Sequence, residues 1–274
     1  MDITTVRTYR VARTPADLVL APGEVFLGGG TWLMSEPQPT TVAFVDLAGM
    51  GWPDVEITPD GLRIAATCPI ATLVAWAKVA PPQWTATAII PDAAHALLAS
   101  FKIWNTATVG GNVCRAFAAA AMVSLCVALD GVAEIWSPAE SAEDEPVTRR
   151  MPVSQLVTGN GTTTLGPGEV LRAIELPEQA LRSRAALRKI ALAEHGRSGA
   201  VVTGRVDPDG ASVFTVTAAT AAPTVLRFVS TPGREELADA VASASGYYSD
   251  PLGPADWRRG VSVVLAERIR EELA

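Results

Sequence analysis

Two glycine clusters are the residues of this chain best suited to bind an anion. They are Gly28-Gly29-Gly30-Thr31 and Gly110-Gly111-Asn112. Glycine lets the backbone approach a ligand closely, and consecutive N–H groups at a helix start form a cationic nest. The first cluster follows the strand-like Val25-Phe26-Leu27, the second follows Thr108-Val109, and each precedes an apolar stretch of helical length. Two such nests together are suited to a large anion, such as the pyrophosphate of a dinucleotide.

Neither cluster belongs to a general nucleotide-binding motif. Neither is a G-x-G-x-x-G fingerprint or a G-x-x-x-x-G-K-[ST] loop, so the mechanisms attached to those motifs do not transfer. The alternative interpretation is that each cluster is only a tight turn, which glycine favours in any protein. The residues alone leave both interpretations open.

Composition excludes several classes of partner. The 274 residues are 49% hydrophobic and 19% charged, which predicts a folded chain with a large core. The net charge of −7 argues against binding to nucleic acid. The basic clusters Arg182-Ser183-Arg184 and Trp257-Arg258-Arg259 are too short for such a role, and we interpret them as solvated faces.

The sequence predicts a cytoplasmic protein without a membrane span. Its most apolar segment, Ala116 to Leu129, is shorter than the roughly 20 residues that cross a bilayer, so we expect a buried helix there. The start Met1-Asp2-Ile3 does not resemble a signal peptide. Three cysteines without C-x-x-C spacing and two histidines argue against a disulfide framework or a metal or iron–sulfur centre.

Short strand and helix signals alternate through the first part of the chain. Strands are expected at 5–10, 25–27, 42–47, 55–57, 62–66, 132–136 and 170–176. Helical segments are expected at 15–20, 70–79, 92–100 and 116–129, with Pro69 and Pro91 opening two of them. Thr58-Pro59-Asp60-Gly61 predicts a hairpin turn, and the Glu-, Ser- and Pro-rich stretch 137–147 predicts a solvent loop.

After Pro177 the pattern changes. Segments 185–192, 199–206 and 213–218 suggest an antiparallel meander with a turn at Pro208-Asp209-Gly210. Amphipathic helices are expected at 235–245 and 261–273. The switch near 177–184 therefore predicts a domain boundary, followed by an α+β module.

Taken together and in order, these motifs resemble the flavoprotein (medium) subunit of the molybdenum hydroxylases, the group of carbon monoxide, xanthine and aldehyde dehydrogenases. The most specific landmark of that family, I-R-N-x-A-T-I-G-G-N, corresponds to Ile103 through Asn112. The family's A-G-G-T-D-L corresponds to Gly28 through Leu33. Further matching segments are Val45-Asp46-Leu47, Ile64–Cys68, Ala128–Gly131, Ile174–Pro177, Arg188–Ile190 and Trp257–Arg268.

The resemblance implies a fold and a division of the chain. It implies an α+β protein in which two small α/β subdomains, about 1–53 and 54–177, form a PCMH-type FAD-binding domain over residues 1–177. Residues 178–274 would form a C-terminal α+β domain with an antiparallel sheet and helices, like that of the carbon monoxide dehydrogenase flavoprotein.

The resemblance also implies a non-covalent FAD held against both glycine clusters. The first cluster would offer N–H groups to the pyrophosphate, the second would allow another backbone approach, and Asn112 would add an amide that donates and accepts. Lys189 corresponds to a segment near the isoalloxazine ring, although an exposed strand cation is an equal alternative. The implied cofactor-binding residues are Leu27, Gly28, Gly29, Gly30, Thr31, Trp32, Leu33, Thr108, Val109, Gly110, Gly111, Asn112, Ala121, Leu171 and Lys189.

Four positions depart from the family pattern. Trp32 replaces an Asp, Trp104 replaces an Arg, Ala118 replaces a Pro and Ala121 replaces an Asp that lies on the flavin side in relatives. Losing such an acceptor typically costs about 1–3 kcal/mol. The two tryptophans either stack on an aromatic ring of the ligand or fill core space.

Three functions follow from these observations. The leading hypothesis is an electron-transfer flavoprotein subunit with no catalytic acid–base residues of its own. In it, a molybdenum-binding large subunit oxidises the substrate, an iron–sulfur small subunit passes electrons to FAD, and FAD reduces an acceptor such as NAD or quinone. The second is a scaffold or assembly subunit of the same fold that has lost FAD. The third is a stand-alone flavin oxidase.

Overall fold

In the computed structural model, residues 3–137 and 146–274 are described. Most of the expected solvent loop at 137–147 therefore lies outside the described residues. Its two ends are strand residues, because Ser137 closes β6 (Val132–Ser137) and Val147 opens β7 (Val147–Pro152).

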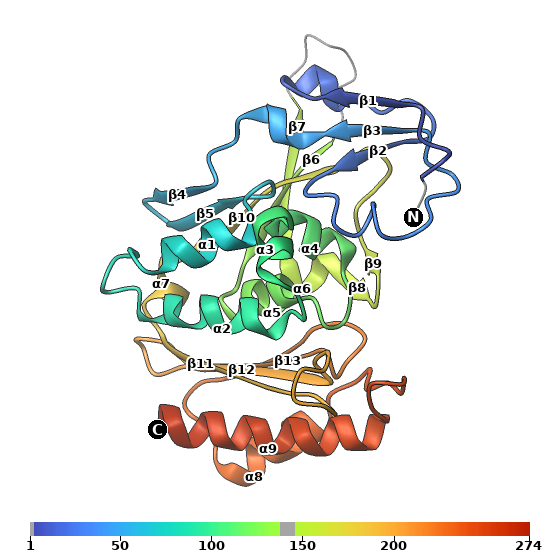
Figure 1. The fold of residues 1–274 in the computed structure, drawn as a ribbon. Helices are drawn as coiled ribbons and strands as arrows, with labels where there is room; N and C mark the ends of the chain where they lie inside the picture. The colour runs from blue at the N-terminus through green and yellow to red at the C-terminus, as the bar shows by residue number, and fades with distance from the viewer. Residues whose placement is uncertain (1–2, 138–145) are drawn as a thin grey trace.

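A three-stranded parallel sheet forms the N-terminal layer, at the top of Figure 1. Its order is β1 (Thr8–Val11), β3 (Ala43–Asp46), β2 (Glu24–Leu27). The central strand β3 begins with the buried apolar run Ala43, Phe44 and Val45, as expected for a strand with neighbours on both sides. The 3-10 turn η1 (Pro15–Leu18) lies between β1 and β2 in the chain, and η2 (Leu47–Met50) follows β3.

An antiparallel five-stranded sheet carries the middle of the chain. Its order is β4 (Val55–Thr58), β5 (Gly61–Ala65), β10 (Val170–Pro177), β6, β7. The predicted hairpin is confirmed, since β4 and β5 pair antiparallel around a turn at 59–60. Strand β7 was not predicted, because this edge strand contains Thr148, Arg149 and Arg150 instead of an apolar run.

Short helices lie between this sheet and the C-terminal part (Figure 1). The buried helix α5 (Ala121–Ala128) has apolar residues on every side, as expected for a helix that α2 (Ile89–Ala96), α4 (Val109–Arg115), α6 (Val153–Leu156) and the C-terminal sheet surround. A two-stranded ribbon of β8 (Val157–Gly159) and β9 (Thr162–Thr163) follows α6. The helical elements are α1 (Ile70–Ala77), η3 (Thr85–Ala88), α2 (Ile89–Ala96), α3 (Phe101–Thr106), α4 (Val109–Arg115), α5 (Ala121–Ala128) and α6 (Val153–Leu156).

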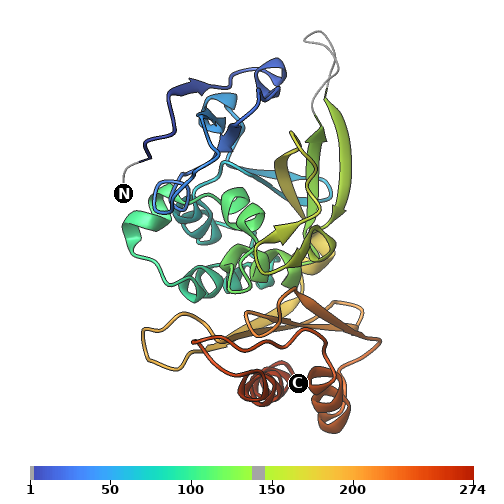
Figure 2. The ribbon, with the colours of Figure 1, turned by 90° about the vertical axis from the view of Figure 1, so that its right-hand side faces the viewer.

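The C-terminal part is an antiparallel sheet between two helical layers (Figure 2). One face of the sheet packs on α2 and α5, and the other packs on α8 (Arg234–Ala242) and α9 (Ala255–Leu273). The short helix α7 (Glu178–Leu181) precedes it. The strands, in sheet order, are β11 (Arg184–Ile190), β12 (Ala200–Val206), β13 (Ser212–Thr217) and β14 (Thr224–Phe228).

The expected meander and final helices are present, with β14 as an additional strand. The predicted domain boundary near 177–184 stays a prediction. Leu187, Val201 and Ala218 of the C-terminal sheet region belong to the same buried cluster as the central helices, although a second cluster lies between this sheet and α9.

Three predicted elements are wrong in extent or type. The helix expected from Ala116 is α5, which begins only at Ala121, because Ala116 has a φ of +50° and turns the chain. Pro91 does not open its helix but lies in the first turn of α2, where a missing N–H costs nothing. Thr108 is not a strand residue but the N-cap of α4.

In the described residues, no helix is both long and apolar enough to cross a bilayer. The longest of them, α9, contains charged residues along its length.

Candidate cofactor site

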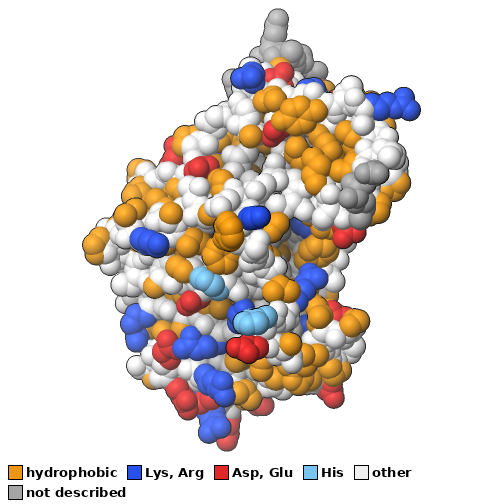
Figure 3. Space-filling model, in the orientation of Figure 1, with side chains coloured by type: hydrophobic (Ala, Val, Ile, Leu, Met, Phe, Trp, Pro, Cys, Tyr) orange, Lys and Arg blue, Asp and Glu red, His pale blue; other side chains and the backbone are white. Residues whose placement is uncertain are grey.

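Both glycine clusters line one cavity of about 550 Å³, a size typical of small-molecule sites. Its walls come from the loop after β2, from the segment that runs from Leu97 through α3, and from α4. Phe117, two residues after the end of α4, also lines it. Exposed apolar side chains such as Leu98 and Phe101 lie on this segment. Charged side chains of both signs gather lower down on the molecule, over the C-terminal part (Figure 3).

The first glycine cluster has free donors. Strand β2 ends at Leu27, and none of the backbone N–H groups of residues 28–33 donates to an acceptor within 3–137 or 146–274. Gly30 has a φ of +69°, a left-handed conformation that glycine adopts without strain. A run of unpaired N–H groups in a cavity wall is the geometry of an anion nest.

Glycine is also required here for packing between loops. A Cβ on Gly29 would lie 1.7 Å from the carbonyl oxygen of Thr106, and one on Gly28 would lie 2.9 Å from Thr108 Oγ1. The two glycines therefore let the loop after β2 rest directly on the segment before α4. That contact places the two clusters in one cavity.

The second cluster differs from the expectation, because its N–H groups are already engaged. Gly110 N donates to Ala66 O at 2.9 Å, Gly111 N donates to Thr108 Oγ1 at 3.0 Å, and Asn112 N donates to Thr108 O at 3.0 Å. The prediction of a second cationic nest is thus wrong. A Cβ on Gly110 would lie 2.4 Å from that of Ala66, so this glycine permits α4 to pack against the residue after β5.

Side chains, not amides, give the second cluster its polar groups in the cavity. Asn112 Oδ1 accepts from Met122 N at 2.8 Å, which leaves the Nδ2 group as the donor available to a ligand. The Thr108 hydroxyl accepts from Gly111, so its own hydrogen is still available to donate.

The structure separates the predicted site residues into two sets. Leu27, Val109, Ala121 and Leu171 are at most 7% exposed, and neither they nor the buried Gly110 line the cavity. Those that do line it are Gly28, Gly29, Gly30, Thr31, Trp32, Leu33, Thr108, Gly111 and Asn112.

Lys189 lies apart from the cavity lining. Its Nζ donates to the carbonyl oxygen of His95, near the end of α2, at 2.7 Å. The following loop approaches the cavity through Arg197, whose guanidinium lies 5.1 Å from the Phe117 ring. A role for Lys189 beside a flavin ring stays a prediction.

Arg115 is the principal residue that sequence reasoning missed. Its guanidinium carbon lies 3.9 Å from the centre of the Trp32 ring and 4.1 Å from that of Phe117, so the cation is held between two aromatic rings. Burial lowers the pKa of Arg115, and the charge of Glu36 opposes this shift. Helical spacing was an available signal, because Arg115 follows Gly111 by one turn of α4.

The two tryptophans that depart from the family pattern have different environments. Trp32 lines the cavity and stacks on Arg115. Trp104 is packed against the central core, with its ring edge-on to His95 at a centroid distance of 4.8 Å. Of the alternatives left open, core packing applies to Trp104, whereas Trp32 is in the cavity. The other departures, Ala118 and Ala121, are buried.

Comparisons with known proteins agree with this architecture. The family described as the FAD binding domain in molybdopterin dehydrogenase matches residues 10–179. A chain of reconstituted CO dehydrogenase from Oligotropha carboxidovorans superposes with a TM-score of 0.84 at 20% identity, covering 100% of this chain and 99% of that chain. A comparison with curated proteins finds no significant match.

Two further solved structures show the same fold over the whole chain. A chain of quinoline 2-oxidoreductase from Pseudomonas putida 86 has a TM-score of 0.79 at 19% identity and covers 100% of this chain and 98% of that chain. A chain of carbon monoxide dehydrogenase from Hydrogenophaga pseudoflava, in a form lacking the Mo-pyranopterin moiety, has a TM-score of 0.79 at 17% identity and covers 98% and 97%. The expected α+β fold of this family is therefore confirmed.

Proposed function

Because the chain belongs to the family of FAD-binding domains of the molybdopterin dehydrogenases, we propose that it binds FAD non-covalently in the cavity between its two glycine clusters. The observation that carries this proposal is the row of unpaired N–H groups at residues 28–33 in the cavity wall. No Asp or Glu is among the described residues that line this cavity, so its polar groups favour an anion.

The residues present fit the diphosphate of such a cofactor. The close approach at Gly28 and Gly29 leaves no room for a Cβ, and the amides of this loop have no acceptor within the described residues. Thr31 and Asn112 add side-chain donors from opposite walls. When bound, FAD supplies the electron-transfer chemistry, and the chain binds it, orients it and excludes water.

We further propose that the chain is the electron-transfer subunit of a larger complex. Electrons would reach it from an iron–sulfur small subunit served by a molybdenum-binding large subunit, and leave to an acceptor such as NAD or quinone. Support comes from the whole-chain likeness to carbon monoxide dehydrogenase and quinoline 2-oxidoreductase chains. In this proposal the chain is cytoplasmic and inactive alone.

One observation favours a second function, that of a scaffold without FAD. The stack of Trp32, Arg115 and Phe117 fills part of the cavity, and buried alanines stand at two polar or rigid family positions. A cavity filled by its own side chains would serve assembly instead of electron transfer.

Flavin content distinguishes the two functions. The protein is purified with FAD present, desalted, and its visible absorption is measured. The electron-transfer proposal expects stoichiometric yellow flavin that acid precipitation releases. A colourless protein that also fails to quench the fluorescence of added FAD would overturn it and support the scaffold.

Partners are tested by gentle co-purification from the native host, with molybdenum and iron analysis of the eluate. We expect this chain together with a molybdenum-containing chain and a small iron–sulfur chain. Recovery of the chain alone, with robust turnover of an organic substrate, would contradict the subunit proposal and favour a stand-alone oxidase.

A further inference from the structure

We propose that Arg115 is the cation that pairs with the diphosphate of a dinucleotide in this cavity, and that Trp32 and Phe117 are positioning residues that hold its guanidinium in place. This inference rests on the proposed function only for the class of ligand, a dinucleotide. Arg115 itself is assigned by its contacts and by the charges around it.

The local fold builds the stack from two segments of the chain. Arg115 is the last residue of α4, and Ala116 then takes a φ of +50°. This turn brings Phe117 back against the guanidinium, while Trp32, from the loop after β2, contacts it within the same cavity. Two ring contacts of about 4 Å restrict a flexible side chain, so less rotamer entropy is lost when a ligand binds.

Arg115 forms no salt bridge within residues 3–137 and 146–274, although the charge of Glu36 acts on it. Its Nε is buried without a hydrogen-bond acceptor among the described residues. It is the charged residue among those that line the cavity in the described part of the chain. An unpaired buried polar group is costly, and a phosphate oxygen that accepts from this Nε would remove that cost.

Two fully buried arginines, unlike the half-buried Arg115, are paired within the fold. Arg205 pairs with Asp130 and Asp207, and Arg258 pairs with Asp250 and donates to carbonyl oxygens. These two arginines are complete within the fold. Arg115 differs from both because it has no carboxylate partner among the described residues.

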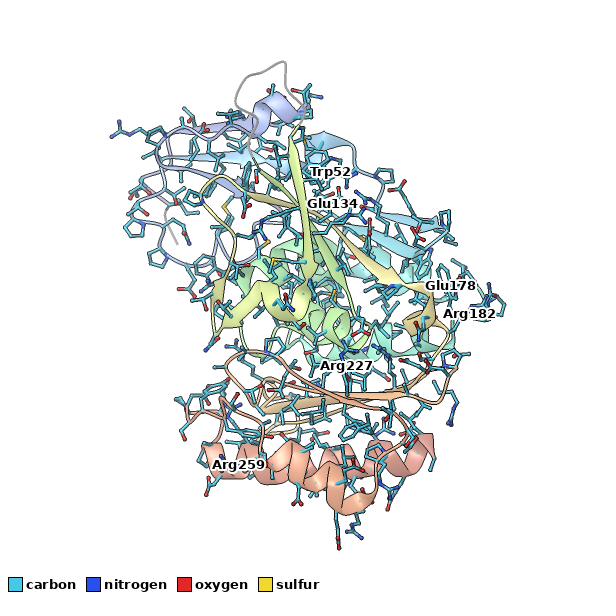
Figure 4. All side chains as sticks on the ribbon, turned by 180° about the vertical axis from the view of Figure 1, so that it is seen from behind. Trp52, Glu134, Glu178, Arg182, Arg227 and Arg259 are labelled. Carbon is cyan, nitrogen blue, oxygen red and sulfur yellow. The ribbon has the colours of Figure 1, made fainter. Side chains whose placement is uncertain are left out.

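Arg172 provides the closest internal counterpart. Its guanidinium lies 4.3 Å from the Trp52 ring and 5.5 Å from the Trp136 ring, and its Nε and Nη1 also lack partners among the described residues. The charge of nearby Glu134 partly balances it, on the sheet face where Trp52 and Glu134 lie in Figure 4. Arg172 does not line the cavity between the glycine clusters. Contact with aromatic rings alone therefore does not make a binding site, whereas Arg115 combines such contacts with a cavity that offers hydrogen-bond donors.

The first experiment compares ligands with and without a diphosphate. Dissociation constants for FAD, ADP and riboflavin are measured by calorimetry on the full chain and on Arg115→Gln. A hydrogen-bonded ion pair to phosphate predicts that FAD and ADP bind about 10- to 100-fold more weakly to the variant. Riboflavin, which has no phosphate, should bind equally to both proteins or to neither.

The matched control is Arg259→Gln. Arg259 is also an arginine near an aromatic ring, 5.1 Å from that of Tyr247, but it lies on α9 at the far end of the molecule (Figure 4). Its variant should bind FAD like the original chain. Unchanged FAD affinity in a folded Arg115→Gln protein would overturn the inference and leave the proposed function standing. Failure of the original chain to bind FAD or ADP would instead overturn both.

A double-mutant cycle tests the positioning role of Trp32. If Trp32 acts through Arg115, Trp32→Leu weakens FAD binding in the original chain and has little further effect in the Arg115→Gln background. If Trp32 instead contacts the ligand directly, the loss is equal in both backgrounds, which would overturn that role. Arg115→Lys keeps the charge without the planar stack and should restore only part of the affinity.

Discussion

The two glycine clusters look alike in sequence and behave differently in the fold. In the first, the N–H groups of residues 28–33 have no acceptors in the described structure. In the second, Gly110 and Gly111 donate to Ala66 and to Thr108. The first cluster follows the end of a sheet strand and enters a loop, whereas the second starts a helix that packs on the end of β5.

This difference shows that glycine has two separate roles in one site. At Gly28 and Gly29 it lets two loops touch and leaves amides open to a ligand. At Gly110 it lets a helix approach Ala66 in the core. The first role serves binding and the second serves folding. Variants of the first cluster should therefore change FAD affinity, and variants of the second should change stability.

Gly110→Val should have the largest effect, and on stability. Its Cβ would lie 2.4 Å from the Ala66 Cβ and 2.6 Å from the Ala66 Cα, so the core must shift. Overpacking of this kind costs about 3 kcal/mol of the free energy of unfolding. Urea unfolding measures it. Gly260→Val, at a helical glycine with open space around it, is the control and should not lower stability. Equal stability of both variants would show that the second cluster is not a packing device.

Hydrogen exchange compares the two clusters without mutation. The amides of Gly110 and Gly111 should exchange at least about a hundredfold more slowly than those of residues 28–33 in the FAD-free protein, because they are hydrogen-bonded. Added FAD should slow exchange mainly at 28–33. If FAD instead slowed exchange at the second cluster and left exchange at the first unchanged, the second cluster would be the one that binds FAD.

Gly29→Ala should affect binding more than stability. The new Cβ would meet the Thr106 carbonyl oxygen at 1.7 Å, so the loop must move away from its partner segment. We expect FAD affinity to fall about tenfold, as for the loss of one charged hydrogen bond. Fluorescence titration measures this, with Gly233→Ala, which has nothing within 4 Å, as the control. Unaltered affinity would mean that the first loop does not touch the cofactor.

Thr108→Val should have the smallest effect. It removes the Oγ1 that caps α4 by accepting from Gly111 N, at a cost of about 1 kcal/mol in stability. Thermal unfolding detects this loss. FAD affinity should change by less than for Gly29→Ala, because the freed Gly111 amide becomes a new donor in the cavity. If the free energy of FAD binding fell by more than the free energy of unfolding, Thr108 would be a direct ligand contact.

Much of the site was predictable from sequence because its first cluster obeys local rules. A strand ending in consecutive glycines predicts a loop with accessible amides, and residues 28–33 have this geometry. The family motif around Ile103–Asn112 predicted that distant segments share one site, and both clusters line one cavity. What the cavity binds stays a prediction.

The wrong predictions concern segments whose structure depends on contacts with other parts of the fold. The alanine run from Ala116 favours helix at every position, yet α5 begins at Ala121 because the chain turns at Ala116. Edge strand β7 has a polar sequence and is held by β6. Leu171 and Ala121 match family positions and lie in the core, and a contact of either with the cofactor stays a prediction.

The sequence by itself determined the strands with apolar runs, the hairpin at 59–60, the family fold and the two glycine clusters. These depend on backbone preference and on apolar periodicity, which act over a few neighbouring residues. Only the tertiary structure decided which N–H groups remain unpaired and that Arg115 stands between Trp32 and Phe117. A hydrogen bond such as Gly110 N to Ala66 O joins residues far apart in the chain, so its presence depends on packing and not on local sequence.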